Sequence, residues 1–69
     1  MEGFRISLAA ARVNAGMTQD EVAKKMKVSK NTVVAWEKGT TEPKVSQGKA
    51  LSELYNIPLK FIFMPEKSN

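Results

Sequence analysis

The sequence predicts an all-α fold of five short helices packed into one domain. Apolar residues recur at helical spacing, helix-starting and helix-ending residues separate the apolar segments, and no segment alternates convincingly with period two. The chain has 69 residues, 42% of them hydrophobic, so we expect a single domain over residues 1–69 with one small core. It contains no Cys, so helix packing must stabilise it without disulfide bonds.

The first two helices are predicted over about residues 4–14 and from Thr18 to about Met26. The first helix, which Gly16 ends, has an apolar face made of Phe4, Leu8 and Ala11. Beside this face lie Ile6, Ala9 and Val13. Thr18-Gln19-Asp20-Glu21 has the pattern of a capping box, in which the Thr18 hydroxyl accepts from the Glu21 amide and the Glu21 carboxylate accepts from the Thr18 amide. This pattern predicts where the second helix begins.

The third helix is predicted from Lys30 to about Lys38, after a turn of only three residues, 27–29. Ser29 is a suitable N-cap, and Gly39 is a natural stop. Val33 and Trp36 fall on one face three residues apart, so we expect Trp36 in the core and not as a platform for base stacking.

The last two helices are predicted after the loop of residues 40–43. The fourth runs to about Tyr55, and its residues expected to face inward are Val45, Leu51, Leu54 and Tyr55. Asn56-Ile57-Pro58 predicts a turn, followed by a final amphipathic turn or two that Pro65 ends. There Leu59, Ile62 and Phe63 should close the core, with residues 65–69 as a tail.

Charge and composition narrow the classes of function. The net charge is +4, and six lysines lie in the middle of the chain: Lys24, Lys25, Lys27, Lys30, Lys38 and Lys44. Such a cluster fits either a polyanionic partner or a solvated helix surface. There is no His or Cys, no carboxylate pair placed for acid–base catalysis and no phosphate-binding glycine loop, so we expect no enzyme, metal or cofactor. No signal peptide or membrane-spanning stretch is evident, which predicts a cytoplasmic, nucleoid-associated protein.

Two short helices joined by a three-residue turn form a helix-turn-helix. The pieces Gly16-Met17-Thr18-Gln19-Asp20-Glu21-Val22-Ala23, Val28-Ser29-Lys30-Asn31-Thr32-Val33, Trp36-Glu37-Lys38-Gly39 and Glu42-Pro43 resemble the Cro/phage-repressor (Xre-type) family. The resemblance covers about residues 4–63. It implies a compact five-helix, lambda-repressor-like domain, with the helix-turn-helix at about 18–38, that binds double-stranded DNA in a sequence-specific way. Lys27 departs from the pattern, because the family usually has a glycine with positive φ there.

By this resemblance the third helix enters the major groove and reads bases with Lys30, Asn31 and Ala35, with Ser29 and Val34 as neighbours. Lys30 can donate to guanine O6 and N7, and Asn31 can pair bidentately with adenine N6 and N7. Ala35 and Val34 can contact a thymine methyl group. Without the family pattern, a solvated start of a helix would explain the first two residues.

The resemblance also assigns Gln19 to a phosphate, with an extra contact to the recognition helix or to a base as a further option. It pairs Arg12 with Glu37, largely away from water. The set of expected phosphate contacts is Gln19, Thr18, Lys27, Lys38, Thr40, Thr41 and Lys44, whereas we expect Lys24 and Lys25 to lie on the solvent face.

The leading interpretation is a transcriptional regulator, acting as a repressor that binds a palindromic operator as a homodimer. No small-molecule effector is evident. Phe61 and Met64 are the candidates for the dimer surface, although both could simply complete the monomer. The alternative is a protein-interaction module, such as an antitoxin or anti-repressor, built on the same fold.

Overall fold

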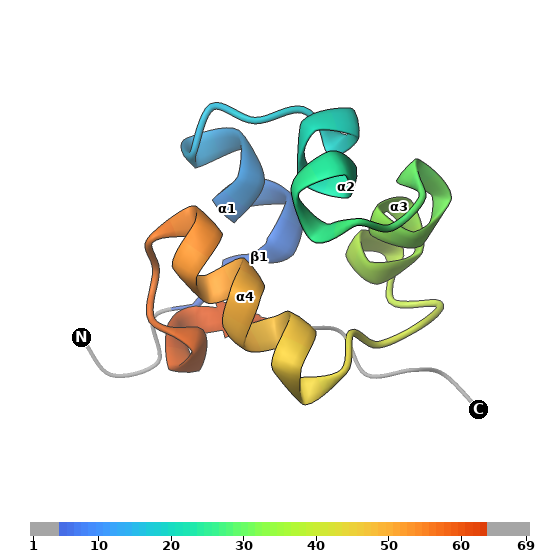
Figure 1. Cartoon of the computed structure of the whole chain (residues 1–69). Helices are drawn as coiled ribbons and strands as arrows, with labels where there is room; N and C mark the ends of the chain where they lie inside the picture. The colour runs from blue at the N-terminus through green and yellow to red at the C-terminus, as the bar shows by residue number, and fades with distance from the viewer. Residues whose placement is uncertain (1–4, 64–69) are drawn as a thin grey trace.

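The computed structural model describes residues 5–63 and contains four α-helices around one core (Figure 1). They are α1 (Leu8–Asn14), α2 (Gln19–Met26), α3 (Lys30–Lys38) and α4 (Val45–Tyr55). A 3₁₀-helix, η1 (Leu59–Phe61), and two short strands, β1 (Ile6–Ser7) and β2 (Ile62–Phe63), complete the fold. The predicted positions Phe4 and Met64 and the tail 65–69 lie outside the described residues.

Three of the four helices begin at a hydroxyl side chain that caps a backbone amide. The Oγ atoms of Ser7 and Ser29 and the Oγ1 atom of Thr18 each accept from the N–H three residues on, at 3.0, 3.2 and 3.1 Å respectively. These contacts satisfy amides that lack an intrahelical partner. Together with Gly39, which ends α3 in the left-handed conformation, they explain why α2 and α3 match the predicted bounds.

The core draws on every helix and on β2. Its buried hydrophobic residues are Leu8, Ala11, Val22, Ala23, Val33, Trp36, Leu51, Tyr55 and Ile62. Partly buried residues pack against this cluster, among them Met17, Val28 and Leu54. Trp36 therefore lies inside the protein, as expected, and its ring is not available to stack on a base.

The prediction of five helices and no strand is wrong at both ends of the described chain. Ile6 and Ser7 pair in parallel with Ile62 and Phe63, so that the first helix begins at Leu8 and not near residue 4. Ile62 is buried, but it reaches the core from a strand after only three residues of 3₁₀-helix. A strand of two residues is too short to show alternation, which is why its sequence gives no signal of its own.

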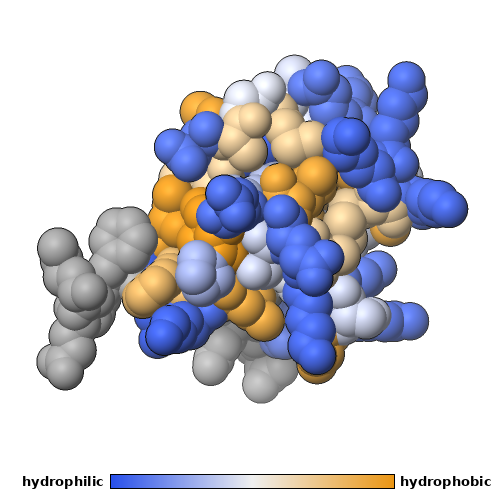
Figure 2. Space-filling model, turned by 60° about the vertical axis from the view of Figure 1, so that its left-hand side comes forward, coloured by the Kyte–Doolittle hydropathy of each residue, from blue (hydrophilic) through white to orange (hydrophobic). Residues whose placement is uncertain are grey.

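Two residues that we expected on the core side are exposed instead. Val13 is 64% exposed, because it lies two residues beyond buried Ala11 and therefore about 200° further around a two-turn helix. Val45 is 76% exposed, because it is the first residue of α4 and precedes the first buried position, Gly48. Figure 2 shows one face of the molecule, on which apolar side chains come to the surface among hydrophilic ones.

Two further features of residues 5–63 concern the classes of function. None of the helices there has the length and apolar character that a crossing of the membrane demands. The same residues also contain no group of three or more acidic, His or Cys side chains that could hold a metal ion.

Candidate nucleic-acid interface

The α2–turn–α3 unit is closed by local hydrogen bonds. In the capping box of α2, the Thr18 N–H donates to Glu21 Oε1 at 2.8 Å and the Glu21 N–H donates to Thr18 Oγ1 at 3.1 Å. These bonds to Thr18 lower the pKa of Glu21, because they favour its charged form. The carboxylate therefore stays ionised at the positive end of the helix dipole.

The turn itself depends on a left-handed lysine. Lys27 has φ 59° and ψ 43°, a left-handed conformation that glycine adopts without strain. The next amide, that of Val28, donates back to the Ala23 carbonyl at 3.0 Å, and the Val28 side chain is half-buried against the core. The turn keeps its geometry, but a residue with a Cβ in this conformation carries a cost of about 1 kcal/mol.

A partly buried polar network fixes the other end of α3 against α1. Arg12 Nε donates to Glu37 Oε2 at 2.8 Å, and the side chains are only 16% and 8% exposed. Arg12 Nη1 also donates to the Met17 carbonyl at 2.9 Å. The hydrogen bond to Glu37 is the main reason why the pKa of Arg12 is raised. The ion pair that the sequence led us to expect is thus formed, and it connects α1, α3 and the loop before α2.

Gln19 joins the same network. Its Nε2 atom donates to Glu37 Oε1 at 2.9 Å, so the side chain contacts α3 and is half-buried. This contact occupies one of the two side-chain N–H groups with which Gln19 could meet a phosphate. Tyr55 lies in the core near this network. Its burial, and to a smaller extent the negative charge of Glu37, raise the pKa of Tyr55 to about 12.

The first residues of α3 stand clear of the core. Ser29, Lys30 and Asn31 are exposed, whereas Val34 and Ala35, one turn further on, are half-buried. The Ser29 hydroxyl is already engaged, since it caps the Thr32 amide and lies 3.0 Å from the Thr32 hydroxyl. We call the exposed side chains of Lys30 and Asn31 the leading edge of α3.

The expected phosphate contacts fall into two groups along the chain. Thr18, Gln19 and Lys27 belong to α2 and its caps, and the Gln19 side chain contacts Glu37, the last residue but one of α3. The second group begins with the last residue of α3, and all its members are exposed: Lys38, Thr40, Thr41 and Lys44.

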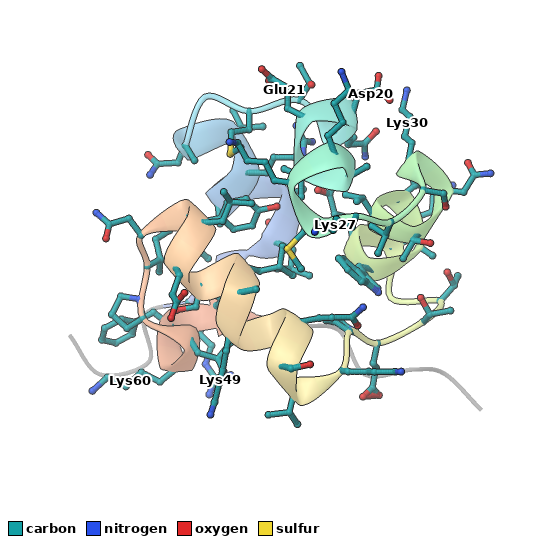
Figure 3. All side chains as sticks on the ribbon, viewed as in Figure 1. Asp20, Glu21, Lys27, Lys30, Lys49 and Lys60 are labelled. Atoms are coloured by element: carbon teal, nitrogen blue, oxygen red, sulfur yellow. The ribbon has the colours of Figure 1, made fainter. Side chains whose placement is uncertain are left out.

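One residue at this surface is not predicted from the sequence. As an acid, Asp20 suits a helix N-terminus, but its Oδ2 also lies 3.8 Å from Lys30 Nζ. Figure 3 shows both side chains at the same edge of the molecule, opposite the edge that carries Lys49 and Lys60. Sequence spacing gives no signal for this pair, because the two residues come from different helices.

The expected dimer surface is only partly described. Phe61 is half-buried in η1, and Lys60 Nζ lies 5.3 Å from the centre of its ring. Met64, the other candidate, lies outside the described residues. The structure therefore leaves the dimer surface as a hypothesis.

Comparisons with known proteins agree with this geometry. A family model described as "Helix-turn-helix" matches residues 8–62. The cryptic phage CTXphi transcriptional repressor RstR of Vibrio cholerae is 33% identical over 66 residues, which cover 96% of this chain and 60% of that protein. The chain thus spans less than two thirds of the length of RstR.

Two archaeal proteins are also similar, and both are named as uncharacterized HTH-type transcriptional regulators. The one from Archaeoglobus fulgidus is 32% identical over 88% of this chain and 87% of its own length. The one from Methanocaldococcus jannaschii is 32% identical over 72% of this chain and 76% of its own length. No solved structure matches the chain.

Proposed function

The chain belongs to the Cro/phage-repressor (Xre-type) family of helix-turn-helix DNA-binding transcriptional regulators, and from this premise we propose that it is a repressor of transcription. In this proposal it recognises a palindromic operator in double-stranded DNA as a homodimer. Each protomer inserts α3 into the major groove and blocks access to the DNA by occupying it.

The observation that carries this proposal is the contrast between the two ends of α3. Glu37, near its C-terminus, is held by Arg12 and Gln19, and Trp36 is buried beside it. The leading edge, in contrast, is exposed, and its Lys30 is paired only with the exposed carboxylate of Asp20 among the ion pairs of the described chain. A helix that is fixed at one end and exposed at the other suits a groove in which side chains must meet base edges accurately.

Base recognition is assigned to the leading edge and to the adjoining surface of α3. Lys30 donates to a guanine, and Asn31 pairs with an adenine through both of its amide functions. Val34 and Ala35 offer only apolar contact, for which the methyl group of thymine is the natural partner. Ser29 contributes chiefly by starting the helix, because its hydroxyl is engaged in the cap.

Phosphate contacts on both sides of α3 would set its position in the groove. Gln19 contributes through its backbone amide in the first turn of α2 and through the side-chain N–H that Glu37 does not engage. Thr18 and Lys27 contact phosphates on the same side as Gln19. The phosphates of the DNA strand that passes the other end of α3 are contacted by the second group, which is Lys38, Thr40, Thr41 and Lys44.

A dimer follows from the small size of the surface that one α3 presents. Two copies related by a two-fold axis would read two half-sites about one helical turn of DNA apart, which multiplies the specificity of a single copy. We assign the contact between them to the segment that contains Phe61 and Met64.

Selection of bound sequences from a random pool of double-stranded DNA tests the proposal directly. We expect an inverted repeat, bound with an affinity that falls steeply with salt, by about 0.9 in log–log slope for each phosphate contact. A selected site without two-fold symmetry would contradict the dimer. If no sequence is enriched at all, the repressor proposal fails, and a protein partner, as in the antitoxin alternative, becomes the explanation of the fold.

A further inference from the structure

We propose that Asp20 determines the specificity of this protein by restricting Lys30 to contacts with bases. The inference rests on the proposed function, because it concerns what Lys30 does once α3 lies in the major groove. Asp20 is in this view a positioning residue: it acts through the ammonium group of Lys30.

The geometry places a carboxylate at the surface where a base-reading cation is needed. Asp20 is the second residue of α2 and Lys30 the first of α3, and their charged atoms lie 3.8 Å apart. Both side chains are largely exposed, at 73% and 53% respectively. Figure 3 shows them side by side at the edge of the helix-turn-helix. The ion pair is thus open to exchange with another partner, and DNA is the partner that this surface would meet.

A lysine alone discriminates poorly at a protein–DNA interface. Its ammonium is a point charge on a flexible four-carbon stem, and it can reach a phosphate as easily as a guanine. A phosphate contact strengthens the binding of every sequence and therefore lowers the ratio of specific to non-specific affinity. Some further group must penalise that alternative if Lys30 is to contribute to specificity.

The Asp20 carboxylate supplies such a penalty. Where Lys30 turns to a phosphate, it must either leave Asp20 or bring the carboxylate close to a second anion, and both cost free energy. At a G·C pair the situation differs, since guanine O6 and N7 offer two acceptors to the ammonium and neither carries the full negative charge of a phosphate. In the presence of Asp20, a contact of Lys30 with a G·C pair is therefore favoured in free energy over a contact of Lys30 with a phosphate.

The test compares three variants of the full chain on the selected operator and on unrelated DNA. In Asp20→Asn the side chain keeps its size but loses its charge. Glu53→Gln is the matched control, because it removes one exposed carboxylate from α4, in a groove between α2 and α4. Asp20→Glu keeps the charge on a longer side chain. All are measured at several salt concentrations.

We expect Asp20→Asn to raise non-specific affinity by on the order of threefold to tenfold, to steepen its salt slope by about one unit, and to reduce preference for G·C at one operator position. Asp20→Glu should restore most of that preference, and Glu53→Gln should leave it unchanged. If Asp20→Asn and Glu53→Gln alter specific and non-specific affinity by the same factor, Asp20 acts only through net charge and the inference is wrong.

A double-mutant cycle tests whether Asp20 acts through Lys30. In a Lys30→Ala background, Asp20→Asn should have no more effect than Glu53→Gln on the G·C preference. An effect of undiminished size in that background would overturn the positioning role. Failure of the unmodified chain to select any DNA would instead reject the proposed function, so the two failures are distinguishable.

Discussion

Two ion pairs end on α3, one at each end, and they differ in almost every physical respect. Arg12 and Glu37 are 2.8 Å apart, nearly buried, and tied into further hydrogen bonds with Gln19 and the Met17 carbonyl. Lys30 and Asp20 are 3.8 Å apart and open to water. The first pair orders the protein, whereas the second leaves its charges available to a ligand. The comparison teaches that the environment of an ion pair, more than the residue types in it, decides what the pair does.

The largest effect is expected from breaking the nearly buried pair of Arg12 and Glu37. Glu37→Ala should lower the free energy of unfolding by about 3–5 kcal/mol, because it strands the Arg12 charge in a nearly buried position. Urea denaturation followed by circular dichroism measures the loss. Lys30→Ala is the control at the other end of α3 and should change stability by less than about 0.5 kcal/mol. Equal losses in the two variants would remove the distinction between the pairs.

Asn31→Ala should alter recognition and leave folding intact, since Asn31 is exposed on the leading edge. We expect a loss of about 1–3 kcal/mol in discrimination at one base pair, with little change in non-specific binding. Titrations of the operator and of single-base variants measure it. Lys44→Ala is the contrasting variant. It should lower the affinity for all DNA sequences alike and reduce the salt slope by about one unit. A sequence-independent loss for Asn31→Ala would make Asn31 a backbone contact.

Lys27→Gly separates stability from binding at the turn between α2 and α3. Glycine accepts the left-handed conformation of this residue without strain. The free energy of unfolding of the variant should therefore exceed that of the unmodified chain by up to about 1 kcal/mol. It should also bind every DNA sequence less tightly, because the proposed phosphate contact is lost. Thermal melts and salt titrations give the two quantities. A less stable variant would indicate that the lysine side chain contributes more than its backbone costs.

The smallest effect concerns Glu21, whose exposed carboxylate caps α2. Its pKa is lower in the folded protein than its usual value of 4.5, so its contribution is present above about pH 4.5 and is lost as the pH falls through the folded value. Glu21→Gln can keep the hydrogen bond to Thr18 but cannot titrate. We expect the unmodified chain to be the more stable at pH 7 and the two denaturation midpoints to converge in acid. Parallel pH profiles would refute this assignment.

Local sequence signals account well for the helix-turn-helix itself. The Thr18 and Ser29 caps and Gly39 predict the bounds of α2 and α3, because each acts within one turn of the residue that it caps. The ends of the fold follow from contacts between residues far apart in sequence, and no local pattern reports them. The exposed positions of Val13 and Val45 were missed for a related reason: a broad apolar stripe does not show where a short helix leaves the core.

The site was predictable to the extent that a family pattern fixes residues at set positions. Such a pattern led to the leading edge and to the partners Arg12 and Glu37, and the structure shows that pair formed. It also led to a contact between Gln19 and α3, although not to Glu37 as the partner. It did not lead to the pair Asp20–Lys30, which depends on how α2 and α3 are inclined to each other, and spacing along the chain does not specify that angle.

The parallel pairing of β1 with β2 has a consequence for how the protein is made. It joins the first described element to the last, across a separation of more than fifty residues. A nascent polypeptide that has left the ribosome only as far as Tyr55 carries all four α-helices but still lacks the strand that covers Ile6 and the buried side chain of Ile62. Residues 62 and 63 must therefore be synthesised before the domain can close.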